Sequence, residues 1–215
     1  MEDAAEGTPA QRTIRETVKH HFAVSACILQ KDARIGKIIG FYSVVFAAHT
    51  LLFFYSQQYF ADLGYNKVQI SVIMLLVGGA SCLGALVSEK MYRWFGKKCL
   101  IPETVIIAGA ILCYGAGKAG VAIAALMCAG FANAALYPIQ SDSLNALIPS
   151  EQRATLISVD SMCFSIVMIV LFPLAGALAD RWGLKTVLLL LGVILLLFLL
   201  TVFCIEKESF SSDHS

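Results

Sequence analysis

Six long stretches of apolar residues dominate the pattern of the chain, and short polar segments separate them. We place these stretches near residues 37–57, 68–88, 99–117, 119–140, 154–179 and 184–205. Each is about as long as a helix needs to cross the hydrocarbon core of a bilayer, which takes ~20 residues. The strands of a membrane barrel are about half as long and alternate in polarity, and these stretches do not alternate. The pattern therefore predicts an all-α membrane protein with six transmembrane helices.

The last two apolar stretches form the clearest predicted hairpin. The run at 154–179 carries one internal carboxylate, Asp160, and it ends at the charged sequence Asp180-Arg181-Trp182-Gly183. Another apolar run begins directly after this turn. Since a water-soluble protein has little use for two membrane-length apolar runs in succession, we interpret them as two antiparallel membrane spans.

The residues before the first stretch are mostly polar. Between residues 13 and 29, Ile14, Val18, Phe22 and Leu29 recur at helical spacing, and basic residues occupy other positions of the helix. This pattern predicts an amphipathic helix at the membrane surface, or else a linker helix that leads into the first span. The acidic, polar start does not resemble a secretory signal. We expect a cytoplasmic segment at 1–36, a membrane domain at 37–205 and a cytoplasmic tail at 206–215.

Lysine and arginine residues are distributed unequally between the two sides of this predicted topology. If the amino terminus is cytoplasmic, twelve of the sixteen basic residues fall on the inner side. These are Arg12, Arg15, Lys19, Lys31, Arg34, Lys37, Lys90, Arg93, Lys97, Lys98, Arg153 and Lys207, against Lys67, Lys118, Arg181 and Lys185 outside. Because short cytoplasmic loops are enriched in Lys and Arg, we expect both termini inside.

Composition agrees with a membrane protein and excludes several other classes. Of the 215 residues, 58% are hydrophobic and 14% are charged, whereas soluble domains carry about 25% charged residues. The mean hydropathy is +0.76. A net charge of +1 gives no reason to expect a nucleic-acid partner. The seven cysteines are scattered without CxxC or Cys/His spacing, so we expect no metal and no cofactor.

A weak internal repeat relates the ends of the second and fifth stretches. The second ends in Gly84-Ala85-Leu86, and Arg93-Trp94-Phe95-Gly96 follows; the fifth ends in Gly176-Ala177-Leu178, and Arg181-Trp182-Gly183 follows. The two turns fall on opposite sides of the predicted membrane. Inverted repeats of this kind recur in secondary transporters, although glycine-rich helix ends also recur by chance. We therefore expect a 3+3 inverted repeat.

Small residues are concentrated in the second, third and fourth stretches. They are Gly78, Gly79, Ala80, Ser81, Gly84 and Ala85, then Gly109 and Ala110, then Gly130 and Ala132. Small side chains let helix backbones approach closely, which drives association where lipid removes the hydrophobic effect between helices. The distribution predicts a tightly packed bundle.

Several segments resemble the carboxy-terminal half of a major facilitator superfamily transporter, in particular bacterial drug- and sugar-type members. These segments are Asn145, Ile148-Pro149-Ser150-Glu151-Gln152-Arg153-Ala154-Thr155, Phe172-Pro173-Leu174-Ala175-Gly176, Asp180-Arg181-Trp182-Gly183, residues 54–64 and residues 84–98. The chain departs from the family at Glu89-Lys90, where the family favours Asp-Arg, and in having six spans where a complete member has twelve. The resemblance implies one half bundle, a location in the bacterial cytoplasmic membrane, and a partner that is either a second six-helix half or a homodimer mate.

The resemblance also implies that the first and fourth helices line a central cavity. Polar and aromatic residues recur at helical spacing on the two corresponding stretches: Tyr42, Phe46, His49, Phe53 and Gln57 on the first, and Asn133, Tyr137 and Gln140 on the fourth. A polar stripe should not face lipid, because each unpaired polar group there costs several kcal/mol. We expect these residues to line a solute pathway, or alternatively to form hydrogen bonds and packing contacts between helices.

Asp160 is the most distinctive single residue, since a carboxylate inside a membrane span is a functional candidate by default. One interpretation is a group that binds and releases a proton during transport. The alternative is a carboxylate near the cytoplasmic end that stays hydrated or pairs with Arg153. Candidate gate and structural residues near the ends of the stretches are Glu89, Lys90, Arg93, Gly96, Asp142, Arg153, Asp180, Arg181 and Gly183.

The sequence therefore favours half of a secondary transporter, which moves a small solute by alternating access together with another six-helix bundle. The alternatives are a membrane scaffold or sensor that transports nothing, and an inactive fragment of a transporter. A membrane enzyme is disfavoured because the chain has no HExxH or GxSxG motif, and because His49 is the one histidine inside a predicted span. The solute, the direction of transport and the coupling ion are not specified by these features.

The predicted threading can be tested with introduced thiols. A cysteine placed at Lys67 or Lys118 should react with a membrane-impermeant maleimide in intact cells, because both positions lie outside in the predicted topology. A cysteine at Lys90 should react only after the membrane is opened. Labelling at 67 or 118 that requires an opened membrane would overturn this topology.

Overall fold

The structure, a computed structural model, describes residues 33–96, 100–114, 118–147 and 153–212. These residues form six helices: α2 (Ala33–Asp62), α3 (Lys67–Phe95), α4 (Leu100–Cys113), α5 (Ala119–Asn145), α6 (Arg153–Trp182) and α7 (Leu184–Ser212). The predicted amphipathic helix at 13–29 lies outside the described residues. The prediction that the membrane domain is built from helices is confirmed, and each predicted apolar stretch corresponds to one helix.

Five of the six helices are long and apolar enough to cross a membrane, and α4 is the exception. Its 14 residues correspond to ~21 Å at a rise of 1.5 Å per residue, whereas the hydrocarbon core measures about 30 Å. The predicted stretch at 99–117 was longer, and parts of its two flanks are outside the described residues. A sixth crossing by α4 therefore stays a prediction.

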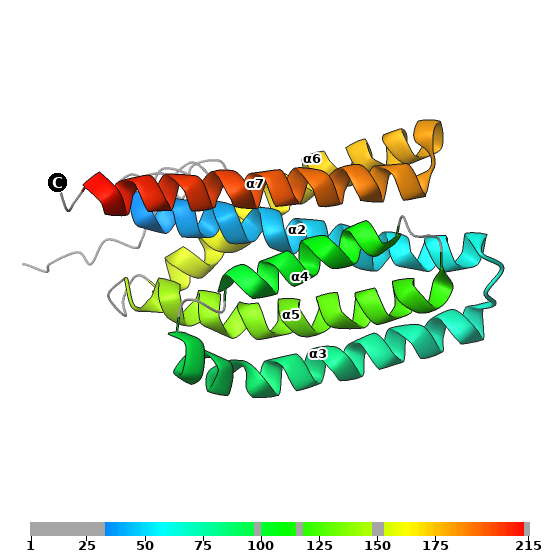
Figure 1. The fold of residues 1–215 in the computed structure, drawn as a ribbon, viewed down its shortest axis with the longest axis horizontal. Helices are drawn as coiled ribbons and strands as arrows, with labels where there is room; N and C mark the ends of the chain where they lie inside the picture. Colours follow the sequence, from blue (N-terminus) through cyan, green and yellow to red (C-terminus); the bar gives the residue numbers. More distant parts are fainter. Residues whose placement is uncertain (1–32, 97–99, 115–117, 148–152, 213–215) are drawn as a thin grey trace, which may run out of the picture.

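Successive helices run in opposite directions along one bundle (Figure 1). The start of α2, the end of α3, the start of α6 and the end of α7 all lie at one end of the bundle, and the connections α2–α3 and α6–α7 lie at the other. Trp94 near the end of α3 and Trp182 at the end of α6 are both more than half exposed, and they therefore mark opposite ends. Tryptophan favours the membrane–water interface, so we expect the two faces of the bilayer near these two levels.

Local sequence explains where the helices begin and end. Asn66 starts α3 with a capping box: its Oδ1 accepts a hydrogen bond from the Gln69 N–H, and its own N–H donates to Gln69 Oε1, each at 2.9 Å. Between α6 and α7 the connection is the single residue Gly183 at φ +80°, a conformation that glycine adopts without steric cost. This turn is tighter than the predicted charged turn, because Asp180 and Arg181 still belong to α6.

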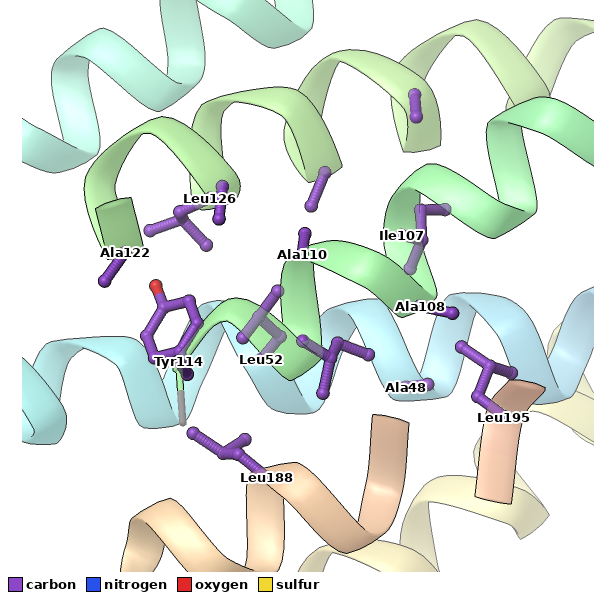
Figure 2. Packing of buried hydrophobic residues seen from close by; sticks show 14 of the residues in the cluster. Ala48, Leu52, Ile107, Ala108, Ala110, Tyr114, Ala122, Leu126, Leu188 and Leu195 are labelled. Carbon is purple, nitrogen blue, oxygen red and sulfur yellow. The ribbon is translucent and has the colours of Figure 1, made fainter. Parts of the chain in front are cut away.

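The main core lies between α2, α4, α5 and α7 (Figure 2). Helix α5 contributes mostly alanines, among them Ala122, Ala125 and Ala129, whereas larger side chains such as Leu52 and Leu188 come from α2 and α7. Alanine leaves little space between backbones, so α4 lies close to α5. Close packing of this kind replaces the hydrophobic driving force that lipid removes.

Helix α3 packs against α5 through opposed small residues. The sequence predicted close packing of the bundle but not which helices would be paired. A Cβ atom at Gly84 would overlap the backbone carbonyl of Phe131, and one at Gly130 would lie 2.8 Å from Ser81 Oγ. Ser88 adds a hydrogen bond from its hydroxyl to the Ala135 carbonyl at 2.8 Å. Gly78 and Gly79, in contrast, have open space where their Cβ atoms would be, so only part of the glycine-rich stretch is used within this bundle.

The crossing of α3 and α5 predicts a large difference between two glycines of one helix. Gly84→Ala should destabilise the bundle by about 1–3 kcal/mol, because the new methyl group forces the two backbones apart. Gly79→Ala should leave stability unchanged or raise it by up to about 1 kcal/mol, since glycine weakens a helix interior. The measurement is the apparent free energy of unfolding by SDS titration in bicelles. Equal values for the two variants would contradict the close contact.

Candidate functional site

The predicted stripe on α2 passes from the core to the surface. Tyr42 is buried in the core cluster, while Phe46, His49 and Phe53 are half-buried and Gln57 is exposed. The ring of Phe46 lies 5.6 Å from that of Tyr42 and 5.9 Å from that of Tyr137 on α5. The stripe therefore lies partly in the core and partly at the surface, and Phe46, between these two parts, contacts α5.

The predicted stripe on α5 divides in the same way. Tyr137 is 62% exposed, Asn133 is half-buried and Gln140 is only 2% exposed. Gln140 Nε2 donates a hydrogen bond to Asp160 Oδ1 at 2.9 Å. The interpretation as an interhelical hydrogen bond thus applies to Gln140, whereas Tyr137 is exposed and Asn133 is half-buried with its Oδ1 covered.

A pocket of about 280 Å³ lies where α2, α3 and α5 meet. Its lining residues are His49, Thr50 and Phe53 from α2, Val77 and Ser81 from α3, and Asn133 from α5. Three of the predicted pathway residues, His49, Phe53 and Asn133, are therefore brought together. Thr50 and Val77 were not predicted as site residues, and nothing in the pattern of α3 marked Val77 as facing a pocket.

The polar groups of this pocket fall into two kinds. The hydroxyls of Thr50 and Ser81 donate to carbonyls of their own helices, Phe46 at 2.7 Å and Val77 at 2.9 Å. His49 Nε2 and Asn133 Oδ1 are buried and have no hydrogen-bond partner within the described part of the chain. Leaving such a group unpaired costs about 1–3 kcal/mol. The pocket thus contains one imidazole and one amide whose hydrogen-bonding capacity is not used internally.

Asp160 lies beside a small apolar cluster at the end of the bundle where α6 begins. The cluster joins Ile35 and Ile39 of α2 with Leu144 of α5 and with Leu156 and Val159 of α6. Asp160 is half-buried and accepts the hydrogen bond from Gln140. Arg153 is exposed, and no ion pair between it and Asp160 is present among the described side chains. The predicted Arg153 partner is therefore replaced by Gln140.

The candidate gate and structural residues lie mostly in helix ends rather than in separate turns. Glu89, Lys90 and Arg93 belong to α3, Asp142 to α5, and Asp180 and Arg181 to α6. Arg93 Nε lies 3.8 Å from Glu89 Oε1, and the Lys90 Nζ lies 4.7 Å from the centre of the Trp94 ring. Exposed pairs of this kind contribute less than about 1 kcal/mol.

Two of these residues have clear backbone roles. Gly96 caps α3 at φ +56° and donates its N–H to the Tyr92 carbonyl. Gly183 donates its N–H to the Ala179 carbonyl at 2.9 Å, which closes the end of α6. Both are glycines because L-residues with side chains rarely adopt positive φ.

Two segments that are far apart in the sequence meet near the opposite end of the bundle. The Tyr55 hydroxyl donates to the Phe172 carbonyl at 3.2 Å, and the two rings stack with centres 5.3 Å apart. A Cβ atom at Gly176 would lie 3.0 Å from the Tyr55 hydroxyl, so a glycine there makes room for the tyrosine. These residues belong to two of the segments on which the family resemblance was based.

The architecture and the pocket together define a class. Five apolar helices of membrane-spanning length, a core of small residues and a polar pocket between helices are the features of a multi-pass helical membrane protein.

Comparison with known proteins gives the family. A sequence model of the Major Facilitator Superfamily matches residues 104–213, which is more than half of the chain and covers most of α4 together with α5, α6 and α7. The chain therefore belongs to this superfamily of membrane transporters. The helices α2 and α3 lie outside the matched range. Neither a curated protein nor a solved structure matches the chain.

The bond between α5 and α6 can be measured with a double-mutant cycle. Gln140→Leu and Asp160→Leu should each destabilise the bundle, because each leaves the other polar group unpaired. The double variant should cost about 1 kcal/mol less than the sum of the two. As a control, Ser158→Ala combined with Gln140→Leu should be additive, since Ser158 is exposed and its hydroxyl donates to the Ala154 carbonyl of its own helix. Additivity of the Gln140 and Asp160 variants would contradict the bond.

Proposed function

We propose that this chain is one six-helix half of a secondary transporter, which moves a small solute across the bacterial cytoplasmic membrane by alternating access. Membership of the superfamily supports transport as the activity. The observation that carries the proposal is the pocket between α2, α3 and α5. It contains unpaired polar atoms from α2 and α5, and these are the first and fourth helices of the bundle.

The depth of this pocket supports a solute site. His49 and Phe53 lie near the middle of α2, Val77 and Ser81 near the middle of α3, and Asn133 near the middle of α5. The pocket is therefore about halfway along the bundle. Transporter sites for solutes and coupling ions typically lie near the bilayer midplane, because access can then alternate between the two sides around a fixed site.

The outer surfaces of α3 and α6 support a partner bundle. Only a small part of either helix is buried inside this bundle, and large apolar side chains such as Leu75, Leu86 and Ile169 are exposed on them. Such faces suit either lipid or a second apolar bundle. One wall cannot enclose a solute, so alternating access requires a second six-helix unit, which is either another half or a second copy of this chain.

The helix pairings support the inverted repeat. In an inverted repeat, α2 corresponds to α5, α3 to α6, and α4 to α7. Under this correspondence, the contact between α3 and α5 is equivalent to the contact between α6 and α2. The contact between α4 and α5 is likewise equivalent to the contact between α7 and α2. All four of these contacts are present, and so are α4–α7 and α2–α5, which the exchange leaves unchanged. Three other contacts break the symmetry: α6–α7, α2–α4 and α2–α3 are present, and their counterparts α3–α4, α5–α7 and α5–α6 are not comparable pairs.

We assign Asp160 to proton coupling and the surrounding cluster to a cytoplasmic gate. The Gln140–Asp160 bond links α5 and α6, which otherwise touch only weakly. Protonation of the carboxylate would weaken this charge-assisted bond. In this scheme the exposed residues at the helix ends, Arg93 and Arg153 among them, hold the cytoplasmic ends of the bundle, and both termini are inside.

Transport can be tested in inside-out and right-side-out vesicles made from membranes that contain the chain with any partner it needs. The vesicles are incubated with a mixture of small neutral, cationic and anionic solutes, and their contents are analysed by mass spectrometry. We expect one class of solute to be moved, and we expect His49→Ala and Asp160→Asn to slow its movement by about tenfold or more, which corresponds to the loss of one strong interaction.

Ser158→Ala serves as the matched control on α6 and should transport at the wild-type rate. If the wild type moves a solute and both test variants equal it, the assignment of His49 and Asp160 is wrong. If cross-linking in native membranes shows a partner, and the complex moves none of the solutes, a scaffold or sensor replaces the transporter as the proposed function.

A further inference from the structure

The pocket between α2, α3 and α5 has a chemical character that narrows the class of solute. Its lining consists of the uncharged side chains Thr50, Phe53, Val77, Ser81 and Asn133 together with the imidazole of His49. Among the described residues, no Asp, Glu, Lys or Arg lines the pocket. A charged group that enters such a site leaves its water without gaining a counter-charge from this wall, so its entry is disfavoured.

The polar atoms without an internal hydrogen-bond partner determine which hydrogen-bonding groups a solute must carry. Asn133 Oδ1 accepts hydrogen bonds and cannot donate them, while the free nitrogen of a neutral imidazole donates or accepts according to its tautomer. A hydroxyl group is both donor and acceptor, so it satisfies either atom. Both atoms are covered in this conformation. Each side chain must therefore turn slightly toward the pocket when a solute binds.

The apolar walls and the volume of the pocket determine the size of the solute and the kind of apolar surface that it can carry. Phe53 and Val77 provide an aromatic face and a branched aliphatic surface. The volume of about 280 Å³ is nearly twice the ~150 Å³ of an engineered protein cavity that binds benzene. There is thus room for one six-membered ring with small substituents, in contact with both apolar and hydrogen-bonding side chains.

We propose that the pocket binds a small uncharged cyclic molecule that carries hydroxyl groups, and that His49 and Asn133 bind those hydroxyls. This inference rests on the proposed transport function for its biological use. These hydrogen bonds discriminate strongly between ligands. A ligand without the hydroxyls leaves a buried polar group of the protein unpaired, and this costs more binding free energy than a missing apolar contact.

The test is binding of three probes that share one ring, measured by ligand-observed NMR on the chain purified in lipid nanodiscs. Cyclohexane-1,3-diol is uncharged and carries two hydroxyls, whereas cyclohexylammonium and cyclohexanecarboxylate are charged. Empty nanodiscs provide the background for partition into lipid. We expect saturable binding of the diol and at least about tenfold weaker binding of both charged probes.

Two matched variants of α5, one within the pocket and one outside it, locate the binding groups. Asn133→Leu has nearly the same shape and removes the amide, so it should weaken binding of the diol by about fivefold or more, the loss of one hydrogen bond. Ser143→Ala lies outside the pocket and removes a hydroxyl that is already bonded to the Ile139 carbonyl, so it should change binding less than twofold. The thermal stability of Asn133→Leu should equal or exceed that of the wild type, because an unpaired polar group is removed.

Equal binding of the charged probes, or unchanged binding of the diol by Asn133→Leu, would overturn the inference. Either result leaves the proposed transport function intact if vesicles still move a solute. Conversely, specific binding of the diol by a protein that moves no solute would uphold the pocket chemistry and contradict the transporter. The two proposals therefore fail by different measurements.

Discussion

Polar groups inside a bilayer must find partners within the protein, because hydrocarbon offers none. Most polar side chains of this bundle meet that requirement locally. The hydroxyls of Ser143 and Ser165 each donate to the carbonyl four residues earlier, at 2.7 Å. Such bonds satisfy the side chain without constraining a neighbouring helix. The few bonds that cross between helices are therefore the ones that determine how the bundle is assembled.

Among the described residues, three side-chain hydrogen bonds join the helices α2, α3, α5 and α6, and a fourth, from the Tyr59 hydroxyl to the Tyr114 carbonyl at 3.4 Å, joins α2 to the residue after α4. Ser88 joins α3 to α5, Tyr55 joins α2 to α6, and Gln140 joins α5 to α6. Ser88 and Tyr55 donate to backbone carbonyls near a proline of the receiving helix, Pro138 in α5 and Pro173 in α6. A proline inside a helix removes one backbone hydrogen bond and perturbs the turn before it.

The buried polar atoms that lack a hydrogen-bond partner are informative about function. His49 and Asn133 leave polar atoms unpaired in a pocket at mid-depth. Glu103 is a second kind of exception. It is buried in the first turn of α4, and neither carboxylate oxygen has a hydrogen-bond partner among the described residues. A membrane protein that tolerates such costs usually does so where a ligand or a proton is handled.

Much of this architecture could be read from the sequence alone. The lengths of the apolar stretches predict the helices, because the thickness of the bilayer fixes how many residues a span requires. Gly96 and Gly183 mark helix ends, since positive φ is a local backbone property that the neighbouring residues reveal. The stripe residues His49, Phe53 and Asn133 were predicted from two sources: the family resemblance implied which helices line a cavity, and spacing indicated which residues share one face of each helix.

Only the tertiary structure decided which of these faces meet. Spacing on α2 did not distinguish Tyr42, which enters the core, from His49, which lines the pocket. It also did not reveal that Gln140 pairs with Asp160 rather than facing the pathway, or that Gly84 contacts α5 while Gly79 faces outward. The physical reason is that helix periodicity repeats identically along each span, whereas the rotation and crossing point of neighbouring helices depend on how small and large side chains fit together across the interface.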